Sequence, residues 1–493
     1  MPSANAAAVS SWQRFLRSDQ AKIILLGCFF CGWHVCFVDK AIQIHEETVQ
    51  NNNNAVPLVA PSPGRRRMSD SRSRRGRSSS ASSYSDKPTC INDPSQIPQR
   101  WKYPRGLSFP DSPEEWTKDE QALALSAGNK AMDELLDFYH SISQERLLDI
   151  GTDALSSVAD FCLGSASEPV FHKKACEGGA FVAKGLLKDD NEKKNKEAFD
   201  WSSTTCEDTH SKAKKLLYLN YLAKELPQDK ELQKLLDRLV NFMQATLNDC
   251  GTLNHYLDVQ SWEADLRTLQ TPRVTIRHYV HRSNVLTDLY NVPHLDLGPL
   301  KHEMDRFTAT LWKYLGDYRY MNARDVRRGF EDSRARHHAY LVTHIAYMPS
   351  GFGRHALTDV PEAPWLYRYI RENYYAAMEE GDLDLFAEFI DILRSYGCSE
   401  ENDVMVRHGT RFMLDQYAKE GYTWMKEKDY PAKLRPDDYD LIHLPWTAAA
   451  GVFRCGNGDP VVPGSFGYAF QEALERGTNT NEVQQILRRR AKK

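Results

Sequence analysis

The chain has 493 residues, of which 41% are hydrophobic and 26% are charged, and this composition excludes a collagen, a wholly disordered chain and a membrane protein with many spans. Its 63 Lys and Arg nearly balance its 67 Asp and Glu, for a net charge of -4, so we expect no nucleic-acid partner, which would need a basic surface. Ten cysteines are too few for a scaffold built on disulfides.

The N-terminal residues carry the strongly apolar run of the chain. Residues 1–22 form a short tail with basic residues near its end, and residues 23–38 (IILLGCFFCGWHVCFV) contain no charged side chain. A membrane span usually needs about 20 apolar residues, and flanking lysines can extend a shorter run by snorkelling. We interpret residues 23–40 as an uncleaved signal-anchor, because no clear Ala-x-Ala cleavage site follows. A cleaved signal peptide and a buried helix are the alternatives.

The charges around this run predict the orientation of the chain. More basic residues precede the run than closely follow it, which favours a cytoplasmic N-terminus. The C-terminal body would then be luminal or extracellular, in the secretory pathway, with the membrane as its partner through a single pass. Residues 41–113 contain four consecutive Asn, several prolines and an Arg/Ser tract. Such a segment cannot bury enough apolar surface to fold, so we predict a disordered tether.

From residue 114 onward the pattern is helical, and we predict an all-α fold built as a multi-helical hairpin array. We divide it into a helical region, 114–298, and a helical domain, 299–493, that carries the candidate site. A capping box, Thr117 to Glu120, begins the first helix. The best strand candidate is 273–280 (RVTIRHYV), where apolar residues alternate. The other expected helices are 151–163, 170–188, 209–225, 229–248, 299–316, 334–347, 362–380, 383–396, 401–419, 442–453 and 479–490.

The first candidate cluster lies at the end of the expected helix 334–347. His344 sits in an apolar stretch there, so it faces either the core, as a satisfied structural histidine, or a cavity, as a catalytic group. A Pro- and Gly-containing turn follows, and after it Arg354 and His355 would bind an anionic group of a substrate.

The second cluster lies at the start of the expected helix 383–396. Asp382 would cap this helix, with Asp384 in its first turn and Glu388 one turn later on the same face. A capped helix with favourable dipole charges explains Asp382 and Asp384. Glu388 has apolar neighbours, and a carboxylate in such surroundings is a candidate acid or metal ligand.

The third cluster combines an aspartate, a histidine and a tryptophan. Asp440 and His443 are three residues apart and can share a helical face, and Trp446 would supply an aromatic platform. Pro445 suits a first helical turn, which puts His443 just before the helix. The structural alternative is a loop histidine beside an aspartate cap.

These motifs resemble those of poorly characterised helical-hairpin proteins of the α/α-toroid kind. The resemblance covers about residues 330–455 and rests on Thr-His…Tyr…Gly-Phe-Gly from Thr343, Gly-Asp-x-Asp-Leu-x-x-Glu from Gly381 and Tyr-Asp-x-x-His-x-x-Trp-Thr from Tyr439. It implies helix ends that converge on a central site. Toroid families include glycosidases, polysaccharide lyases, uronate epimerases and terpenoid cyclases, although the aspartate run of the cyclases is not matched.

We therefore expect a membrane-anchored enzyme, a lyase, hydrolase, epimerase or cyclase, that acts on a carbohydrate or other cyclic substrate by acid/base chemistry. The expected catalytic residues are His344, Glu388, Asp440 and His443, and the expected substrate-binding residues are Arg354, His355 and Trp446. The metal and the cofactor are left open. Some of the seven cysteines after the apolar run should pair in an oxidising lumen. The alternatives are a non-catalytic, membrane-tethered interaction protein and a soluble protein whose N-terminus is a targeting segment.

Overall fold

A computed structural model describes residues 88–98, 112–164, 169–187, 201, 209–267, 271–351, 356–357, 364–419, 438–452 and 468–478. The chain divides into two units, Met1–Ser82 and Ser83–Lys493, and all of these residues belong to the second. Both predicted helical regions, 114–298 and 299–493, fall in this unit. The predicted tail, the signal-anchor and most of the tether lie outside the described residues. Within the described ranges, no helix combines the length and the apolar character that a membrane span requires.

Helices form all of the regular secondary structure in the described ranges, and these ranges contain no strand. The prediction of an all-α protein is therefore confirmed.

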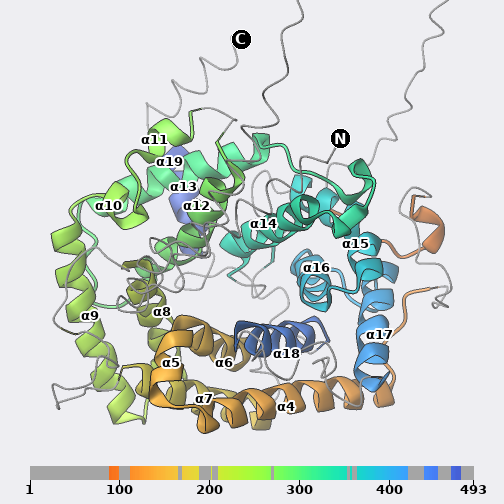
Figure 1. The fold of residues 1–493 in the computed structure, drawn as a ribbon, viewed down its shortest axis with the longest axis horizontal. Helices are drawn as coiled ribbons and strands as arrows, with labels where there is room; N and C mark the ends of the chain where they lie inside the picture. Colours follow the sequence, from red (N-terminus) through yellow and green to blue (C-terminus); the bar gives the residue numbers. More distant parts are fainter. Residues whose placement is uncertain are drawn as a thin grey trace, which may run out of the picture. The chain divides into compact units, whose positions relative to one another are not determined.

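Six helices contact one another in a closed cycle. Each contacts the next in chain order, and the last contacts the first; Figure 1 shows them toward the middle of the unit. In chain order they are α6 (Thr152–Gly164), α8 (Thr209–Glu225), α12 (Arg273–Leu286), α14 (Ser333–Ser350), α16 (Leu383–Ser395) and α18 (Asp438–Val452). We call them the inner helices.

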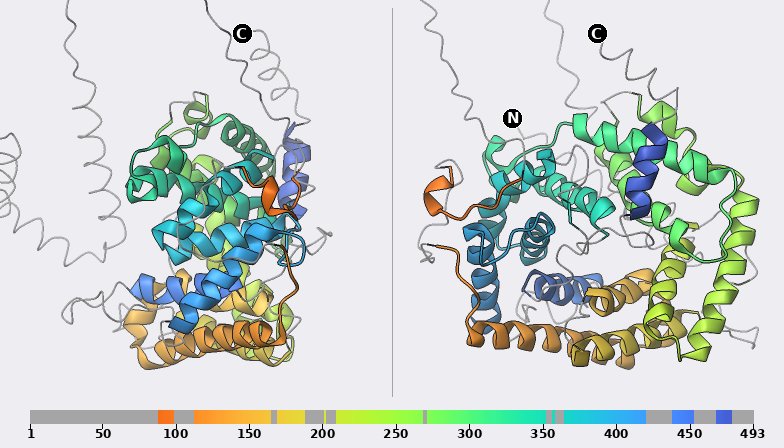
Figure 2. Two further views of the ribbon diagram at one scale, coloured as in Figure 1. Left: turned by 90° about the vertical axis from the view of Figure 1, so that its right-hand side faces the viewer. Right: turned by 180° about the vertical axis from the view of Figure 1, so that it is seen from behind.

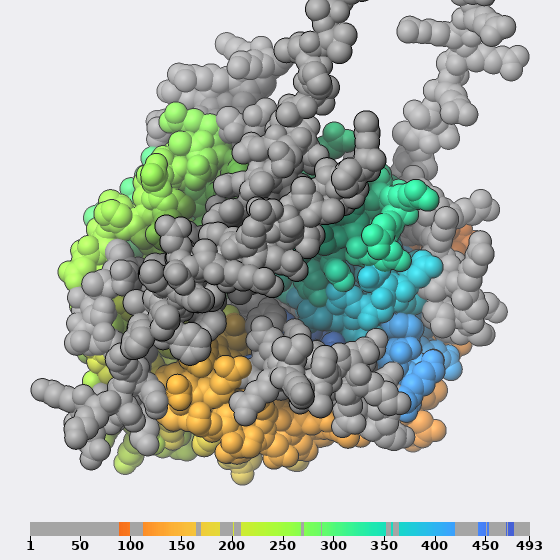
Figure 3. Space-filling view, viewed as in Figure 1, coloured from red at the N-terminus to blue at the C-terminus, as the bar shows by residue number. Residues whose placement is uncertain are grey.

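A second set of six helices packs outside this cycle, one against each inner helix. Figures 1 and 2 show them along the rim. In the space-filling view of Figure 3, α4 and α7 lie in the orange region below, and α17 is blue beside them. They are α7 (Pro169–Leu186), α9 (Lys230–Cys250), α13 (Leu300–Asp317), α15 (Pro364–Glu380), α17 (Val404–Lys419) and α4 (Lys118–Ser141). The last pair brings α18, the last inner helix along the chain, against α4, which precedes all of the inner helices.

Short helices complete the described part of the unit. They are η1 (Pro94–Gln96), α5 (Gln144–Ile150), α10 (Leu253–Leu257), α11 (Trp262–Asp265), η2 (Thr287–Asn291), η3 (Ala323–Asp325), η4 (Gly329–Glu331) and α19 (Tyr468–Thr478). Helix α19, which packs against α13, was not predicted, and the predicted helix 479–490 lies outside the described residues.

The capping box predicted at the start of α4 is confirmed. The Thr117 hydroxyl accepts a hydrogen bond from the Glu120 backbone N–H at 3.2 Å, and the Glu120 carboxylate accepts one from the Thr117 backbone N–H at 2.9 Å. These two bonds satisfy backbone donors that a helix start leaves without intrahelical partners.

The strand predicted at 273–280 is wrong, because these residues form the first turns of α12. Ile276, Tyr279 and Val280 are fully buried, and their spacing of three and four residues is that of one helical face. Over only eight residues, the apolar positions fit both the alternation of a strand and the spacing of a helix. Hydrophobic periodicity alone therefore could not distinguish a strand from a helix here.

The helical start predicted at Pro445 is also wrong. Helix α18 begins at Asp438 and contains Pro445 in its interior, so His443 lies within the helix rather than before it. A proline inside a helix removes one backbone hydrogen bond and usually bends the helix.

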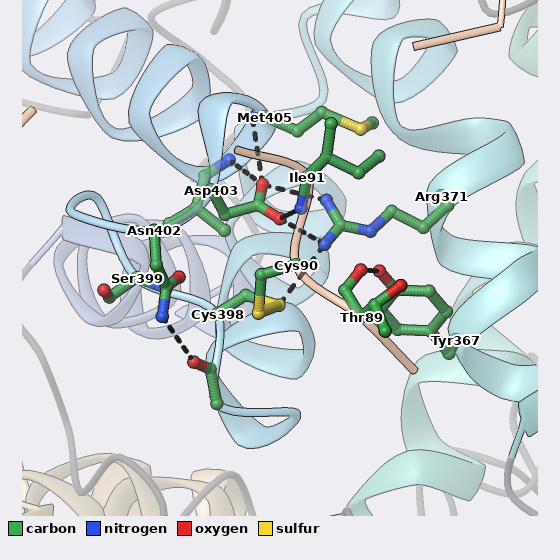
Figure 4. Close-up of polar contacts among 12 residues, drawn as sticks. Thr89, Cys90, Ile91, Tyr367, Arg371, Cys398, Ser399, Asn402, Asp403 and Met405 are labelled. Atoms are coloured by element: carbon green, nitrogen blue, oxygen red, sulfur yellow. Dashed lines mark hydrogen bonds and ion pairs between the residues drawn. A yellow bond between two sulfur atoms is a disulfide. The ribbon is translucent and has the colours of Figure 1, made fainter. Parts of the chain in front are cut away.

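Residues 88–98 fall inside the predicted disordered tether, but the structure shows them fixed to the body of the unit (Figure 4). Cys90 forms a disulfide with Cys398. The Ile91 backbone N–H donates to Asp403 at 2.8 Å, and the Val404 backbone N–H donates to the Ile91 carbonyl oxygen at 2.8 Å. The tether prediction fails here because a covalent link and a buried carboxylate hold the backbone, which composition does not reveal.

Candidate functional site

The N-terminus of α16 places two carboxylates one turn apart. Asp382 caps the helix, as predicted, with its side chain accepting from the Leu385 backbone N–H at 3.2 Å. Asp384 in the first turn and Glu388 one turn later share a face. The Asp384 side chain is 18% exposed, whereas Glu388 is 3% exposed.

Asp384 lies beside polar groups from two other inner helices. Its carboxylate is 3.6 Å from Nδ1 of His443 on α18. The Tyr340 hydroxyl on α14 lies 3.0 Å from Asp384 and 2.9 Å from Asp382, within donating distance of both. Burial raises the pKa of Asp384, but His443, with smaller contributions from Thr447 and Tyr340, outweighs burial and lowers the pKa below its usual value. Asp384 is therefore ionised at neutral pH.

The pKa of Glu388 shifts in the opposite direction. Burial raises its pKa well above 4.5, and the negative charge of Asp384 adds to this effect, while a hydrogen bond from Thr343 opposes it. Its Oε2 atom is buried and has no hydrogen-bond partner among the described residues. Because the negative charge of Asp384 disfavours ionisation of Glu388, Glu388 is the member of the pair that holds a proton more readily.

His344 on α14 is held in one tautomer. Its Nδ1 lies 2.7 Å from the Tyr340 carbonyl oxygen, and because a carbonyl oxygen can only accept, Nδ1 carries the hydrogen. The lone pair is then on Nε2. Burial, with Arg277 and His443 nearby, lowers the pKa of His344 to about 4, so the ring is neutral at neutral pH and can act as a base.

Helix α12 adds a second histidine and a cation. The His281 ring lies with its centroid 4.5 Å from that of His344, and Nε of Arg277 donates to Nε2 of His281 at 3.3 Å. Burial, and after it neighbouring basic groups that include His344 and Arg277, hold the pKa of His281 well below its usual value. Contacts therefore run from Arg277 through His281 to His344, and the charge of Asp384 acts on His344.

Of the predicted catalytic residues, His443 lies beside Asp384, and the charge of Asp384 contributes to the pKa shifts of His344 and Glu388. The Trp446 ring, predicted to bind substrate, lies with its centroid 6.0 Å from that of His443. Asp440 lies in α18, but its side chain is not among those that the structure describes. The predicted binding residues Arg354 and His355 also fall outside the described residues.

Sequence reasoning missed several residues of this cluster. Asp384 was explained as a first-turn charge, although its spacing from Glu388 was a usable signal. His281 and Arg277 lie in or beside the segment taken for a strand. Tyr340 carried no signal, because a tyrosine in a helical apolar pattern is usually part of the core.

All five cysteines in the described ranges are disulfide-bonded. Cys90 pairs with Cys398 and Cys162 with Cys176, and Cys250 is also in a disulfide, so the predicted pairing is confirmed. The described groups with metal-ligand geometry, one around Cys162 and one around Cys90, consist partly of these cysteines, which as disulfides supply no thiolate ligands.

We find no protein-family model, no curated protein and no solved structure that matches this chain.

Proposed function

We propose that the unit Ser83–Lys493 is an α/α-toroid enzyme that acts on a saccharide by acid/base chemistry. The closed cycle of six inner helices, each backed by one outer helix, supports the toroid. The observation that carries the enzymatic proposal is the pair of carboxylates on α16, whose pKa values shift in opposite directions, downward for Asp384 and upward for Glu388. Such a pair places a candidate proton donor beside a negative charge.

Each residue of the cluster has a role in this proposal. Glu388 is the general acid, and its Oε2, which has no partner among the described residues, is the oxygen that would hydrogen-bond to substrate. His344, neutral with its lone pair on Nε2, is the general base. Asp384 lies beside Nδ1 of His443 and orients its ring. Trp446 supplies a platform for a sugar ring, and its indole N–H has no partner among the described residues.

The disulfides support placement in an oxidising compartment. Disulfides persist in secreted proteins and in the lumen of the secretory pathway and are rare in the cytosol, and every cysteine of the described ranges is in one. This agrees with the luminal or extracellular body and single N-terminal anchor that we propose from the charges around residues 23–40.

The proposal is tested by incubating the full chain with a mixture of neutral and acidic oligosaccharides in heavy water, followed by mass spectrometry. Hydrolysis adds the mass of water across the two products, elimination leaves an unsaturated product, and epimerisation through deprotonation incorporates deuterium. One experiment therefore covers three reaction classes and identifies the substrate from the mixture.

Variants decide whether any observed turnover belongs to this site. We expect Glu388→Gln and His344→Gln to lower turnover by about 100-fold or more, which is the usual contribution of a general acid or base. His302→Gln is the matched control, since His302 is an exposed histidine on the outer helix α13. Turnover that survives both site variants would refute the assigned roles, and a chain that transforms no oligosaccharide would favour the non-catalytic interaction protein.

A further inference from the structure

Charge around the candidate site is unevenly distributed among the inner helices. Helix α16 contributes the carboxylates Asp382, Asp384 and Glu388, whereas α12 and α8 contribute Arg277 and Lys214 together with histidines. The rings of His281 and His344 are neighbours, with centroids 4.5 Å apart and planes tilted by 30°; Arg277 donates to His281, and the charge of Asp384 acts on His344.

Arg277 differs from the other cations of this region in its partners. Lys214 is paired with Asp153 at 3.1 Å, and Arg282 donates to His278 and to the Tyr256 carbonyl oxygen. Arg277 is exposed, donates only to His281, and has no carboxylate within ion-pair distance among the described residues. Its terminal guanidinium nitrogens are therefore available to a ligand. They can bind a planar anion with two parallel hydrogen bonds.

The lowered pKa of His281 reflects its burial and the positive electrostatic potential beside Arg277. After burial, basic neighbours including Arg277 contribute to the lowered pKa of His281. A positive potential that disfavours a protonated imidazole favours a bound anion for the same reason. Because His281 accepts from Arg277 through Nε2, its Nδ1 carries a hydrogen and adds a donor.

We propose that Arg277, with Nδ1 of the neighbouring His281, binds an anionic group on the sugar ring, a carboxylate or a sulfate, so that the substrate is an acidic saccharide. The anion would lie on the α12 side, and the reacting part of the sugar would face Asp384, Glu388 and His443. This inference rests on the proposed function for the sugar, but its binding step does not depend on turnover.

Three probes that share one pyranose ring test the inference: D-glucuronate, D-glucose 6-sulfate and D-glucose carry a carboxylate, a sulfate and a hydroxyl at the same carbon. Dissociation constants for the full chain are measured by saturation-transfer difference NMR, which detects weak binding. We expect at least one anionic probe to bind about tenfold more tightly than glucose, as a hydrogen-bonded charge pair provides. The better anionic probe identifies the group as a carboxylate or a sulfate.

Variants connect this preference to Arg277. Arg277→Gln should remove the preference and leave glucose binding unchanged, whereas Arg277→Lys should retain part of it, because the charge remains without the guanidinium fork. Arg411→Gln removes one exposed charge from the outer helix α17 and should behave like the wild type. Equal binding of all three probes, no binding of any probe, or a preference that survives Arg277→Gln would each overturn the inference.

The same measurements separate this inference from the proposed function. Glu388→Gln should keep the anionic preference, since Glu388 belongs to α16 and the proposed anion contacts belong to α12. A neutral oligosaccharide turned over in a Glu388-dependent manner, together with equal binding of the probes, would overturn only the inference. An Arg277-dependent preference without turnover of any oligosaccharide would overturn only the proposed function.

Discussion

Replacement of Glu388 by glutamine should stabilise the protein at neutral pH and make its stability less dependent on pH. The carboxyl group is 3% exposed, its Oε2 has no hydrogen-bond partner among the described residues, and Asp384, Asp382 and Asp391 are its charged neighbours. Glutamine has nearly the same shape as a protonated glutamate but does not ionise in the unfolded chain, so the substitution removes the free-energy cost of protonating the carboxylate on folding.

The direction follows from the number of protons that each state binds. In the unfolded chain Glu388 ionises near pH 4.5, whereas its pKa in the folded protein is well above that value. Between the two pKa values the folded state binds one more proton than the unfolded state, so the free energy of unfolding falls as pH rises. The slope is about 1.4 kcal/mol per pH unit for one proton, and it vanishes above the folded pKa.

Urea unfolding followed by circular dichroism, with linear extrapolation to water, measures this effect. The free energy of unfolding of the wild type minus that of Glu388→Gln should fall by about 1.4 kcal/mol per pH unit over the lower part of the range from about pH 5 to about pH 7. Glu401→Gln, which alters an exposed carboxylate, should give a curve parallel to the wild type. A parallel curve for Glu388→Gln would mean that Glu388 is ionised and cannot be the general acid.

Two further substitutions test the packing that supports the site. Asp403→Asn should lower the free energy of unfolding by about 3–5 kcal/mol, because it leaves the fully buried guanidinium of Arg371 without its counter-charge. The control, Arg328→Gln, should change the free energy of unfolding by less than about 1 kcal/mol, because both side chains of its ion pair are more than half exposed. Gly409→Ala should cost about 1–3 kcal/mol, because a Cβ there would collide with the Tyr374 hydroxyl. Urea unfolding measures both, and an unaltered midpoint for either would contradict the packing argument.

The helices of the body were predictable because each buries a long periodic face. Helix α8 occupies the predicted residues 209–225, and α16 ends within one residue of the prediction. Such signals accumulate over several turns, so a single unfavourable residue does not cancel them. Shorter or interrupted patterns failed: the eight residues of 273–280 fitted two periods, and Pro445 matched a start rule although the helix begins seven residues earlier.

The sequence identified only those site residues whose polarity differs from that of their neighbours along the chain. His344 and Glu388 are polar side chains in apolar stretches, and that mismatch is visible in the sequence. Asp384 fits its place at a helix start, so only its spacing from Glu388 marked it, and its approach to His443 depends on the packing of α16 against α18. A contact between residues 59 positions apart has no local signal, because tertiary packing decides it.

The energetics of Glu388 argue against a purely structural explanation of the cluster. A capped helix needs Asp382, and a charge in the first turn accounts for Asp384, but neither explains a carboxyl group buried one turn further with an oxygen that lacks a partner among the described residues. Glutamine or leucine would satisfy the packing at a lower cost, since each avoids a buried group that must stay protonated beside an ionised neighbour. Sites where a sequence departs from what the fold alone would favour are where function is expected. Helix formation therefore explains Asp382 at the start of α16. It does not explain Glu388, which lies on the same helical face as Asp384.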